Sequence, residues 1–399
     1  MNNLDFDSFA SLPGACHFQP NCVSGFPFNV EVTDSWAKVG SGIGNEDNAL
    51  QTALGEYFER RHFYMEILSD EENTLDQTLS SDEIQKFAHA FVQTSLCDIE
   101  ESLVSKHSFQ TSTAHRISDF TQCQIPTILI SLSYHNLEKD TQFYSSRDTC
   151  GCSFHRNYET SIYGAIKETM ERQFLIRFWL TKKCLAKLAP QKFEGKFKNT
   201  STYSLYNALK KSGQIEALDI SDPDFPGHCV LIVYGNDKES CNVSYCAGMS
   251  YAETIEQAVE KSVLELWQTF RFMNLFYSLN TCISTIKDRY LLHFLKSNNF
   301  QTFNEITDVI ITHKKSKRPR DALNLQALIR SLVNLNMQGY LYTKPVWIAG
   351  TNYVYCKFFS PSLFLHMDSS SSINLDNDYS RQFIKDIYST RKSMMVPFP

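Results

Sequence analysis

Three segments of the chain place acidic side chains at the spacing of a helical turn. The first is ALGEYFERR, at 53–61, and it is followed by AIKETMERQF at 165–174 and SVLELWQTF at 262–270. In each segment a glutamate stands three positions before a second polar group; the pairs are Glu56 and Glu59, Glu168 and Glu171, and Glu265 and Gln268. The intervals between the segments are long and unequal, so they do not form a solenoid repeat. We interpret them as three helices that converge on one place.

The residues around these acids predict that the acidic faces are buried. At ~100° per residue, Thr52, Glu56 and Glu59 fall within roughly one third of the helix circumference. A small residue stands seven positions before the first acid of each pair; these residues are Ala49, Ser161 and Ala258. A solvated face would not need small residues there. Buried carboxylates require arginines, bound cations or protons, because desolvation of an unpaired one costs roughly several kcal/mol.

The balance of charge in these helices indicates a site for phosphate and metal. Four or five carboxylates against Arg60 and Arg172 leave surplus negative charge, which divalent cations could neutralise. Mg²⁺ takes about one or two carboxylates and completes its shell with water and phosphate oxygens, and arginines bind phosphate through paired hydrogen bonds. The chain has no GxxxxGK[ST] and no GxGxxG run, so this would be a nucleotide site built from helix faces. Ordinary buried ion pairs, Glu59 with Arg60 and Glu171 with Arg172, are the alternative.

Composition and charge exclude several other classes of protein. The net charge of -6 does not indicate a general nucleic-acid binder, and we interpret the basic run at 314–320 as a solvated loop. The N-terminus lacks the pattern of a signal peptide, and no apolar run approaches the ~18 residues that a membrane span needs. The twelve cysteines are therefore expected to be reduced thiols of a cytoplasmic protein.

A zinc site is disfavoured as well. The segment CGCSFH offers Cys150, Cys152 and His155. Two cysteines at alternate positions of a strand point to opposite sides, whereas zinc needs its ligands on one side.

The pattern of elements predicts an α+β fold with mixed, mostly antiparallel sheets. Helical periodicity covers 46–67, 158–183, 252–278, 284–297 and 321–335, and strand-like runs cover 125–135, 228–235, 242–248 and 352–360. Strands and helices do not alternate one for one, which disfavours a doubly wound sheet. We expect a single domain over 1–399, with an N-terminal extension at 1–35 and a proline-containing tail at 390–399.

Four motifs resemble those of the YcaO family. They are TALGEYFERR, RDTCGCSFH with AIKETMERQF, LELWQ, and the final VPFP, and they follow in order from about residue 40 to the last residue. The resemblance implies a YcaO-type fold in which three helices converge on ATP and Mg²⁺. It also implies a reaction on a ribosomal precursor peptide, in which a Cys, Ser or Thr side chain attacks the preceding carbonyl. ATP then phosphorylates the former amide oxygen, and loss of phosphate leaves a thiazoline or oxazoline.

The resemblance further implies roles for individual residues. The expected metal ligands are Glu56, Glu59, Glu168 and Glu171. The expected nucleotide contacts are Thr52, Glu56, Glu59, Arg60, Ser153, Arg172, Glu265 and Gln268. Glu168, Glu171 and Pro399 are expected to act in catalysis. Thr160 stands where a metal-binding glutamate often occurs and Phe270 where an arginine often occurs, so the full ligand set stays open.

The family also implies a role for the tail and a set of partners. The terminal carboxylate of a proline-rich tail would reach the active site, and prolines stiffen such a tail. The first motif starts too near the N-terminus to leave room for a leader-binding domain, and no flavin site is evident. We therefore expect three partners: a Gly/Ser/Cys-rich precursor peptide, a leader-binding subunit that often contains zinc, and an FMN-dependent dehydrogenase.

Two alternatives assume the same fold but a different function. One is formation of a thioamide or amidine by another nucleophile. The other is a non-catalytic ATP-binding scaffold, which Thr160 and Phe270 make conceivable. The proline-containing end favours the cyclodehydratase.

Overall fold

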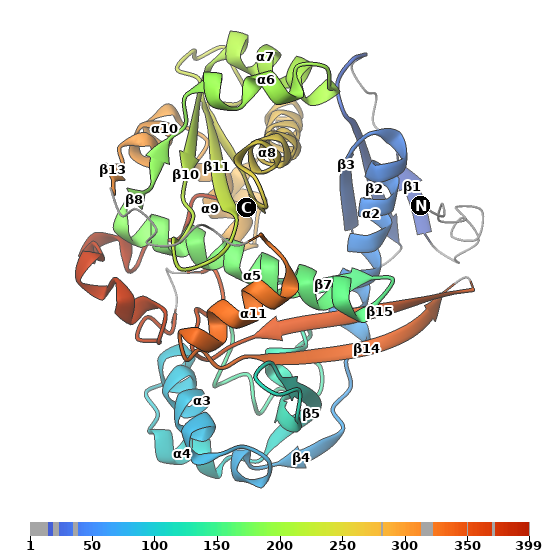
Figure 1. Ribbon diagram of the computed structural model, residues 1–399, viewed down its shortest axis with the longest axis vertical. Coiled ribbons are helices and arrows are strands. Elements are labelled where there is room, and N and C mark those ends of the chain that lie inside the picture. Colours follow the sequence, from blue (N-terminus) through green and yellow to red (C-terminus); the bar gives the residue numbers. More distant parts are fainter. Residues whose placement is uncertain are drawn as a thin grey trace.

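The computed structural model describes residues 15–18, 24–34, 39–280, 282–312, 322–348, 350–368 and 372–398. The basic run at 314–320 and Pro399 lie outside these ranges, so the interpretations that concern them are not addressed by the structure. Within them, helices and antiparallel sheets alternate irregularly along the chain, as expected for an α+β fold (Figure 1).

Three antiparallel sheets form the strand framework of the described residues. The first has the order β1 (Ala15–Phe18), β2 (Phe28–Asp34), β3 (Val39–Gly44). The second has the order β12 (Tyr245–Ala252), β11 (His228–Gly235), β10 (Gln214–Asp219), β9 (Ala186–Lys187). The third has the order β4 (Glu71–Asn73), β5 (Phe109–Arg116), β14 (Tyr340–Ile348), β15 (Thr351–Phe359), β7 (Cys152–His155), with β6 (Gln122–Pro126) beside β5. A short parallel pair, β8 (Lys183–Cys184) and β13 (Ile310–Ile311), completes a mixed, mostly antiparallel arrangement.

Three long helices lie on these sheets, one against each. They are α2 (Glu46–Arg61), α5 (Tyr158–Thr181) and α8 (Ile255–Ser278). Each begins at a polar N-cap whose side chain accepts a backbone N–H three residues later, and these caps are Asn45, Asn157 and Thr254. Helix α5 crosses the middle of the molecule between the second and third sheets (Figure 1).

Small residues bring these helices close to their strands. The predicted positions Ala49, Ser161 and Ala258 have no exposed surface. A Cβ atom at Gly42 of β3 would overlap the backbone of Ala49, and one at Gly248 of β12 would overlap the backbone of α8. The helix backbones therefore rest directly on the strands, which confirms the interpretation of the small residues as contacts of a buried face.

Shorter helices cover the remaining surfaces. They are α3 (Ser81–Thr94), α4 (Glu101–Lys106), α6 (Glu194–Phe197), α7 (Ser201–Ser212), α9 (Arg289–Lys296), α10 (Phe300–Thr307) and α11 (Leu325–Asn334). Within the described residues, no helix is long and apolar enough to cross a membrane. Ten cysteines of this part of the chain are free thiols, from Cys97 to Cys356.

The five predicted helices are confirmed, whereas one predicted strand is wrong. The run at 125–135 leaves β6 at Pro126 and turns into a 3₁₀ helix at Thr127–Leu129. Ile128 and Ile130 are fully buried there, and an apolar run of this length looks the same whether it is a strand or a buried turn. The predicted strand at 242–248 begins at Tyr245, and those at 228–235 and 352–360 are confirmed within one residue.

Candidate nucleotide and metal site

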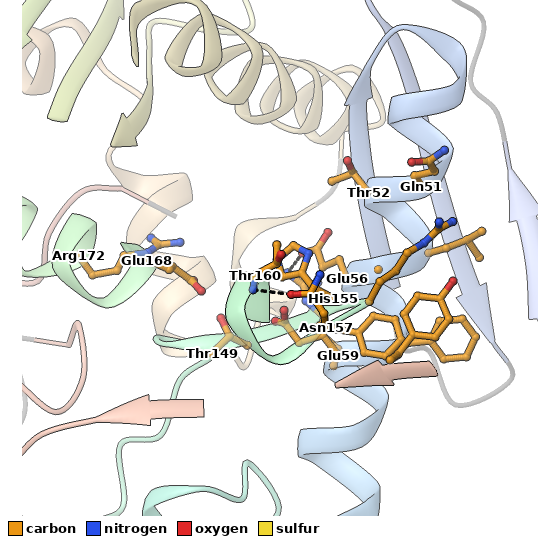
Figure 2. Close-up of a pocket in the computed structure, with 17 residues that line it drawn as sticks. Gln51, Thr52, Glu56, Glu59, Thr149, His155, Asn157, Thr160, Glu168 and Arg172 are labelled. Atoms are coloured by element: carbon orange, nitrogen blue, oxygen red, sulfur yellow. Dashed lines mark hydrogen bonds and ion pairs between the residues drawn. The ribbon is translucent and has the colours of Figure 1, made fainter. Parts of the chain in front are cut away.

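Helices α2 and α5 enclose a cavity of about 690 Å³, which we call the central cavity. Its polar lining is Gln51, Thr52, Glu56, Glu59, Arg60, Thr149, His155, Arg156, Asn157, Thr160, Glu168 and Arg172. Figure 2 labels ten of these residues, which come from the two helices and from the segment before α5. Two of the three predicted helices therefore converge on this cavity, whereas α8 contributes none of its lining.

Two further cavities adjoin the central one. The lysine-side cavity, about 530 Å³, shares Gln51 and Thr52 with it and is otherwise lined by Lys167, Glu171, Lys261, Glu265 and Gln268, among others. The tyrosine-side cavity, about 700 Å³, shares Arg60, Thr149 and Arg172 with it and contains Tyr64, Tyr134 and Tyr290. Every predicted site residue except Ser153 and the undescribed Pro399 lines one of the three.

Glu56 and Arg60 form one locked unit on α2. The backbone N–H of Ser41 donates to Glu56 Oε2 at 2.6 Å, and Glu56 Oε1 pairs with the Arg60 guanidinium. Arg60 also donates to the carbonyl of Val39 at 2.9 Å. Both side chains are thus tied to β3, and burial nevertheless raises the pKa of Glu56 against the opposing charge of Arg60. Arg60 therefore pairs with Glu56 and forms no ion pair with Glu59.

Glu59 and Glu168 have no such partner. Within the described residues neither carboxylate forms a hydrogen bond or an ion pair. Burial, reinforced by the charge of Glu168, raises the pKa of Glu59 well above its usual value. Burial raises the pKa of Glu168 to about 8, although Arg172 opposes the shift. Two buried acids that line one cavity, form no ion pair and keep a raised pKa despite Arg172 and Lys357 fit a divalent cation, since a bound metal would remove the need for protons.

Glu171 and Glu265 are anchored on β12, the edge strand of the second sheet. Glu171 Oε2 accepts the N–H of Tyr251 at 2.5 Å, and Glu265 Oε2 accepts the N–H of Met249 at 2.7 Å. Lys167 Nζ lies 3.6 Å from Glu171. In each carboxylate the second oxygen forms no bond within the described residues. These acids therefore satisfy strand N–H groups with one oxygen and have the other available to a ligand, and burial raises the pKa of Glu265 to about 7.

Gln268 and the two residues that depart from the family pattern lie in different surroundings. Gln268 Nε2 donates to Ser41 Oγ at 3.2 Å, so it joins α8 to β3 beside the lysine-side cavity. Thr160 lines the central cavity and offers a hydroxyl in place of a carboxylate. Phe270 stacks on Trp267 with ring centroids 5.4 Å apart and packs edge-on against Tyr234. An arginine at position 270 would have to enter this apolar cluster, which explains the departure there.

Ser153 makes structural contacts. It is buried, its hydroxyl donates to the carbonyl of Ser161 at 2.6 Å, and Ser161 Oγ donates to the carbonyl of Val354 at 2.8 Å. This chain of bonds fixes the start of α5 on β7 and β15. Its side chain lines none of the three cavities, so its predicted nucleotide contact stays a prediction.

Lys357 is a buried cation that the sequence analysis missed. Only 5% of its surface is exposed, and its ammonium donates to the carbonyl of Asp148 at 3.1 Å. Its positive charge also lowers the pKa of Glu59, against the larger effect of burial. The signal was available, because a lysine inside the apolar strand YVYCKFF is rarely buried without a negative group nearby. Asp148 and Tyr290 also line the tyrosine-side cavity, but nothing in the sequence around them indicated a place in the site.

The zinc alternative gains no support. Among the described residues, no group of three or more His, Cys, Asp or Glu side chains is arranged to hold a metal ion. Mg²⁺ obtains much of its shell from water and phosphate oxygens and needs only about one or two carboxylates from the protein. Glu59 and Glu168 would be its protein ligands in the central cavity.

The raised pKa of Glu168 makes stability depend on pH. An unfolded glutamate titrates near ~4.3, so between that pH and about 8 the unfolded chain loses a proton that the folded protein keeps. The contribution of Glu168 to the free energy of unfolding is fully present below the unfolded pKa and is lost as pH rises through the folded pKa. The free energy of unfolding then falls by at most about 1.4 kcal/mol per pH unit. We expect the ligand-free protein to have a lower Tm at pH 8 than at pH 6, and E168Q to show a smaller drop.

Magnesium should reverse this trend, because metal ligands must be deprotonated. Thermal denaturation with Mg²⁺ and ADP should show a larger gain in Tm at pH 8 than at pH 6. A ligand-free Tm that rises over this interval, or an E168Q profile identical to that of the unmodified protein, would contradict the assignment.

Comparison with known proteins supports the same interpretation. Residues 40–340 match the family model described as YcaO cyclodehydratase, ATP- and Mg²⁺-binding. The chain is 32% identical over 362 residues to the microcin B17-processing protein McbD of Escherichia coli, which covers 90% of both chains. Its fold matches a chain of the E. coli microcin synthetase McbBCD complex with pro-MccB17 bound, with a TM-score of 0.87, 30% identity and 96% of both chains covered.

A more distant structure shows the fold alone. The YcaO protein of Methanopyrus kandleri, solved with AMPPCP and Mg²⁺, matches with a TM-score of 0.55 at 12% identity and covers 88% of this chain and 86% of that one. The family model spans most of the chain, including all three acidic helices. The chain therefore belongs to the YcaO family of ATP- and Mg²⁺-binding cyclodehydratases.

Proposed function

We propose that this chain is the ATP-dependent cyclodehydratase subunit of an azole-forming synthetase similar to the microcin B synthetase. Its substrate would be a ribosomal precursor peptide rich in Gly, Ser and Cys, in which Cys, Ser or Thr residues become thiazolines or oxazolines. The observation that carries the proposal is the pair of buried carboxylates Glu59 and Glu168, which form no ion pair and line one cavity with Arg60 and Arg172 in a YcaO fold. The similarity to McbD supports the identity of the substrate class.

The residues of the central cavity have complementary tasks in this reaction. Glu59 and Glu168 would hold Mg²⁺, with the free oxygens of Glu171 and Glu265 available to a second ion or to water. A bound Mg²⁺ stabilises negative charge on a phosphoryl group during its transfer. Arg60 and Arg172 would bind phosphate oxygens, and the bonds of Arg60 to Glu56 and Val39 orient it beforehand. Thr52 and Gln268, on the lysine-side border, would contact the rest of the nucleotide.

The chemistry balances without any oxidant. The side-chain S–H or O–H of the peptide adds to the preceding carbonyl carbon, and the carbonyl oxygen takes the γ-phosphoryl group of ATP. The carbon–oxygen bond then breaks, phosphate leaves, the amide nitrogen loses its proton and a C=N bond forms. The products are the heterocycle, ADP and phosphate, and the peptide loses the elements of one water.

The tyrosine-side cavity is the place where the peptide would meet the phosphoryl group. It shares Arg60, Thr149 and Arg172 with the central cavity, so both arginines can reach ligands on either side. A peptide carbonyl in this cavity would approach the phosphoryl group beside Arg60 and Arg172, whereas the lysine-side cavity meets the central one at Gln51 and Thr52. Glu168 and Glu171 would then influence catalysis through the charge they place behind the transferring group.

We propose the same set of partners and the same compartment as the sequence suggested. The chain would work as a single catalytic domain in a cytoplasmic complex with a leader-binding subunit and an FMN-dependent dehydrogenase. The match to a chain of the E. coli three-protein synthetase supports this arrangement. The dehydrogenase would oxidise the azolines to azoles.

The direct test is reconstitution of the complex with its precursor peptide. We expect phosphate release that depends on the peptide, and a loss of one water mass for each ring before oxidation. Phosphate release that ignores the peptide would favour the scaffold alternative. Release with a different mass change would favour thioamide or amidine formation.

The metal assignment predicts a large effect of a single isosteric change. E59Q should lower the rate of peptide-dependent phosphate release by about 100-fold or more, because it removes a ligand of the charge-stabilising ion. E46Q is the matched control, since Glu46 lies on the same helix, is exposed and lines none of the three cavities. Equal activity of E59Q and E46Q would refute the role of Glu59.

We also propose that Pro399 acts in catalysis through a carboxylate at the active site. The burial of Phe398, which immediately precedes it, supports this placement. One glycine appended after Pro399 should abolish ring formation and leave the binding of ADP with Mg²⁺ intact, as measured by calorimetry. Full cyclodehydratase activity of the extended chain would eliminate the idea.

A further inference from the structure

We infer that the hydroxyl groups of Tyr245 and Tyr290 fix the last residues of the chain beside the tyrosine-side cavity and act as positioning residues for cyclodehydration. The inference rests on the proposed function and concerns how the tail is held. Three observations carry it: the path of the tail, the hydrogen bonds at its end, and the shared position of Tyr290 and Arg172.

The tail is first secured at the C-terminal end of α5. The N–H of Tyr388 donates to the carbonyl of Leu180 at 3.0 Å, and Trp179 Nε1 donates to the carbonyl of Met394 at 2.8 Å. The Arg391 guanidinium lies 4.1 Å from the centre of the Trp179 ring and donates to the Trp179 carbonyl at 2.8 Å. Residues 388–394 of the tail are therefore held against the end of α5 at Trp179 and Leu180.

Beyond that point the tail is part of the core. Val396 and Phe398 are 2% and 4% exposed, and they belong to the hydrophobic cluster that surrounds α5. These residues line a small void of about 10 Å³ together with Leu175, Phe178 and their neighbours. Residues 395–398 are thus buried in the core, although they form no sheet.

Two tyrosine hydroxyl groups donate hydrogen bonds to the tail in place of the backbone hydrogen bonds that a sheet would supply. Proline has no N–H, so Pro397 offers the surrounding protein only its carbonyl. The Tyr245 hydroxyl donates to this carbonyl at 2.8 Å, and the Tyr290 hydroxyl donates to the Phe398 carbonyl at 2.6 Å. These are consecutive carbonyls, so the pair fixes the direction of the backbone as well as its position.

Both tyrosines are themselves held by ordered elements. Tyr245 is the first residue of β12, and Asn298 Oδ1 accepts its N–H at 3.0 Å. Tyr290 lies in the first turn of α9, which the side chain of Asp288 caps. Burial raises the pKa of Tyr290 to about 12, against the effect of Arg172, so its hydroxyl keeps its proton and can donate at neutral pH.

The latch formed by the two tyrosines adjoins the site. Tyr290 and Arg172 line the same cavity, and Arg172 also lines the central cavity. The Phe398 carbonyl, the last one described, therefore accepts a hydrogen bond from Tyr290, and Tyr290 lines the same cavity as Arg172. A small displacement of the tail would be felt where the peptide and the phosphoryl group meet.

The test uses Y290F and Y245F in the full complex, with Y277F as the matched control. Tyr277 also donates its hydroxyl to a backbone carbonyl, that of Leu295 at 3.0 Å, but it does not touch the tail. We expect kcat for ring formation to fall by about 10-fold or more in Y290F, with KM for ATP and for the precursor within about twofold, since loss of positioning lowers kcat. Y277F should keep the unmodified kcat.

Hydrogen exchange separates positioning from general stability. The amides of Met395, Val396 and Phe398 should exchange faster in Y290F and Y245F than in Y277F, while Tm changes equally in all three. Unchanged exchange at these amides would show that the two hydroxyl groups do not hold the tail. This result is independent of activity, so it can be read even if the unmodified complex forms no rings and the proposed function fails. In an active complex, an unchanged kcat of Y290F, or an equal loss in Y277F, overturns the positioning role.

Discussion

The burial of Glu59 and Glu168 in one cavity, with no ion pair to either carboxylate, is the constraint on which the arrangement of the site depends. Burial raises the pKa of both acids, and the charge of Glu168 raises that of Glu59 further. The helices stay in place because the small residues on these same faces, Ala49 and Ser161, have no exposed surface and rest on strands. A well-packed scaffold thus keeps an unfavourable pair in place for a ligand to neutralise.

The other acids of the site do two things at once. Glu56, Glu171 and Glu265 each accept a backbone N–H from a strand, at Ser41, Tyr251 and Met249. These bonds join the three helices to two sheets through the same carboxylates that face the cavities. The orientation of the helices is therefore fixed by the groups that the ligand would need, so the site cannot loosen without a loss of contacts in the fold.

The sequence predicted the helices that carry the acids, because spacing and small residues act locally along one helix. It did not predict which partner each side chain has. Arg60 pairs with Glu56 rather than with its neighbour Glu59, and Ser153 bonds to α5 rather than facing a cavity. Helix α3 was missed although Ser80 and Glu83 form a capping box before it, a signal that was present in the sequence. The partner and the orientation of each side chain depend on tertiary contacts, which the spacing of residues along the sequence does not reveal.

The described part of the tail, up to Phe398, is held by the core although it lies near the end of the chain. Proline has no N–H to donate to a sheet ladder, and the last residues of a chain are normally the least ordered part of a domain. Here its apolar side chains enter the core around α5, and hydroxyl donors from β12 and α9 take up its carbonyls. Residues more than a hundred positions away in sequence thus define where the chain ends up. The prolines limit the conformations of the free tail, so less entropy is lost when it is held.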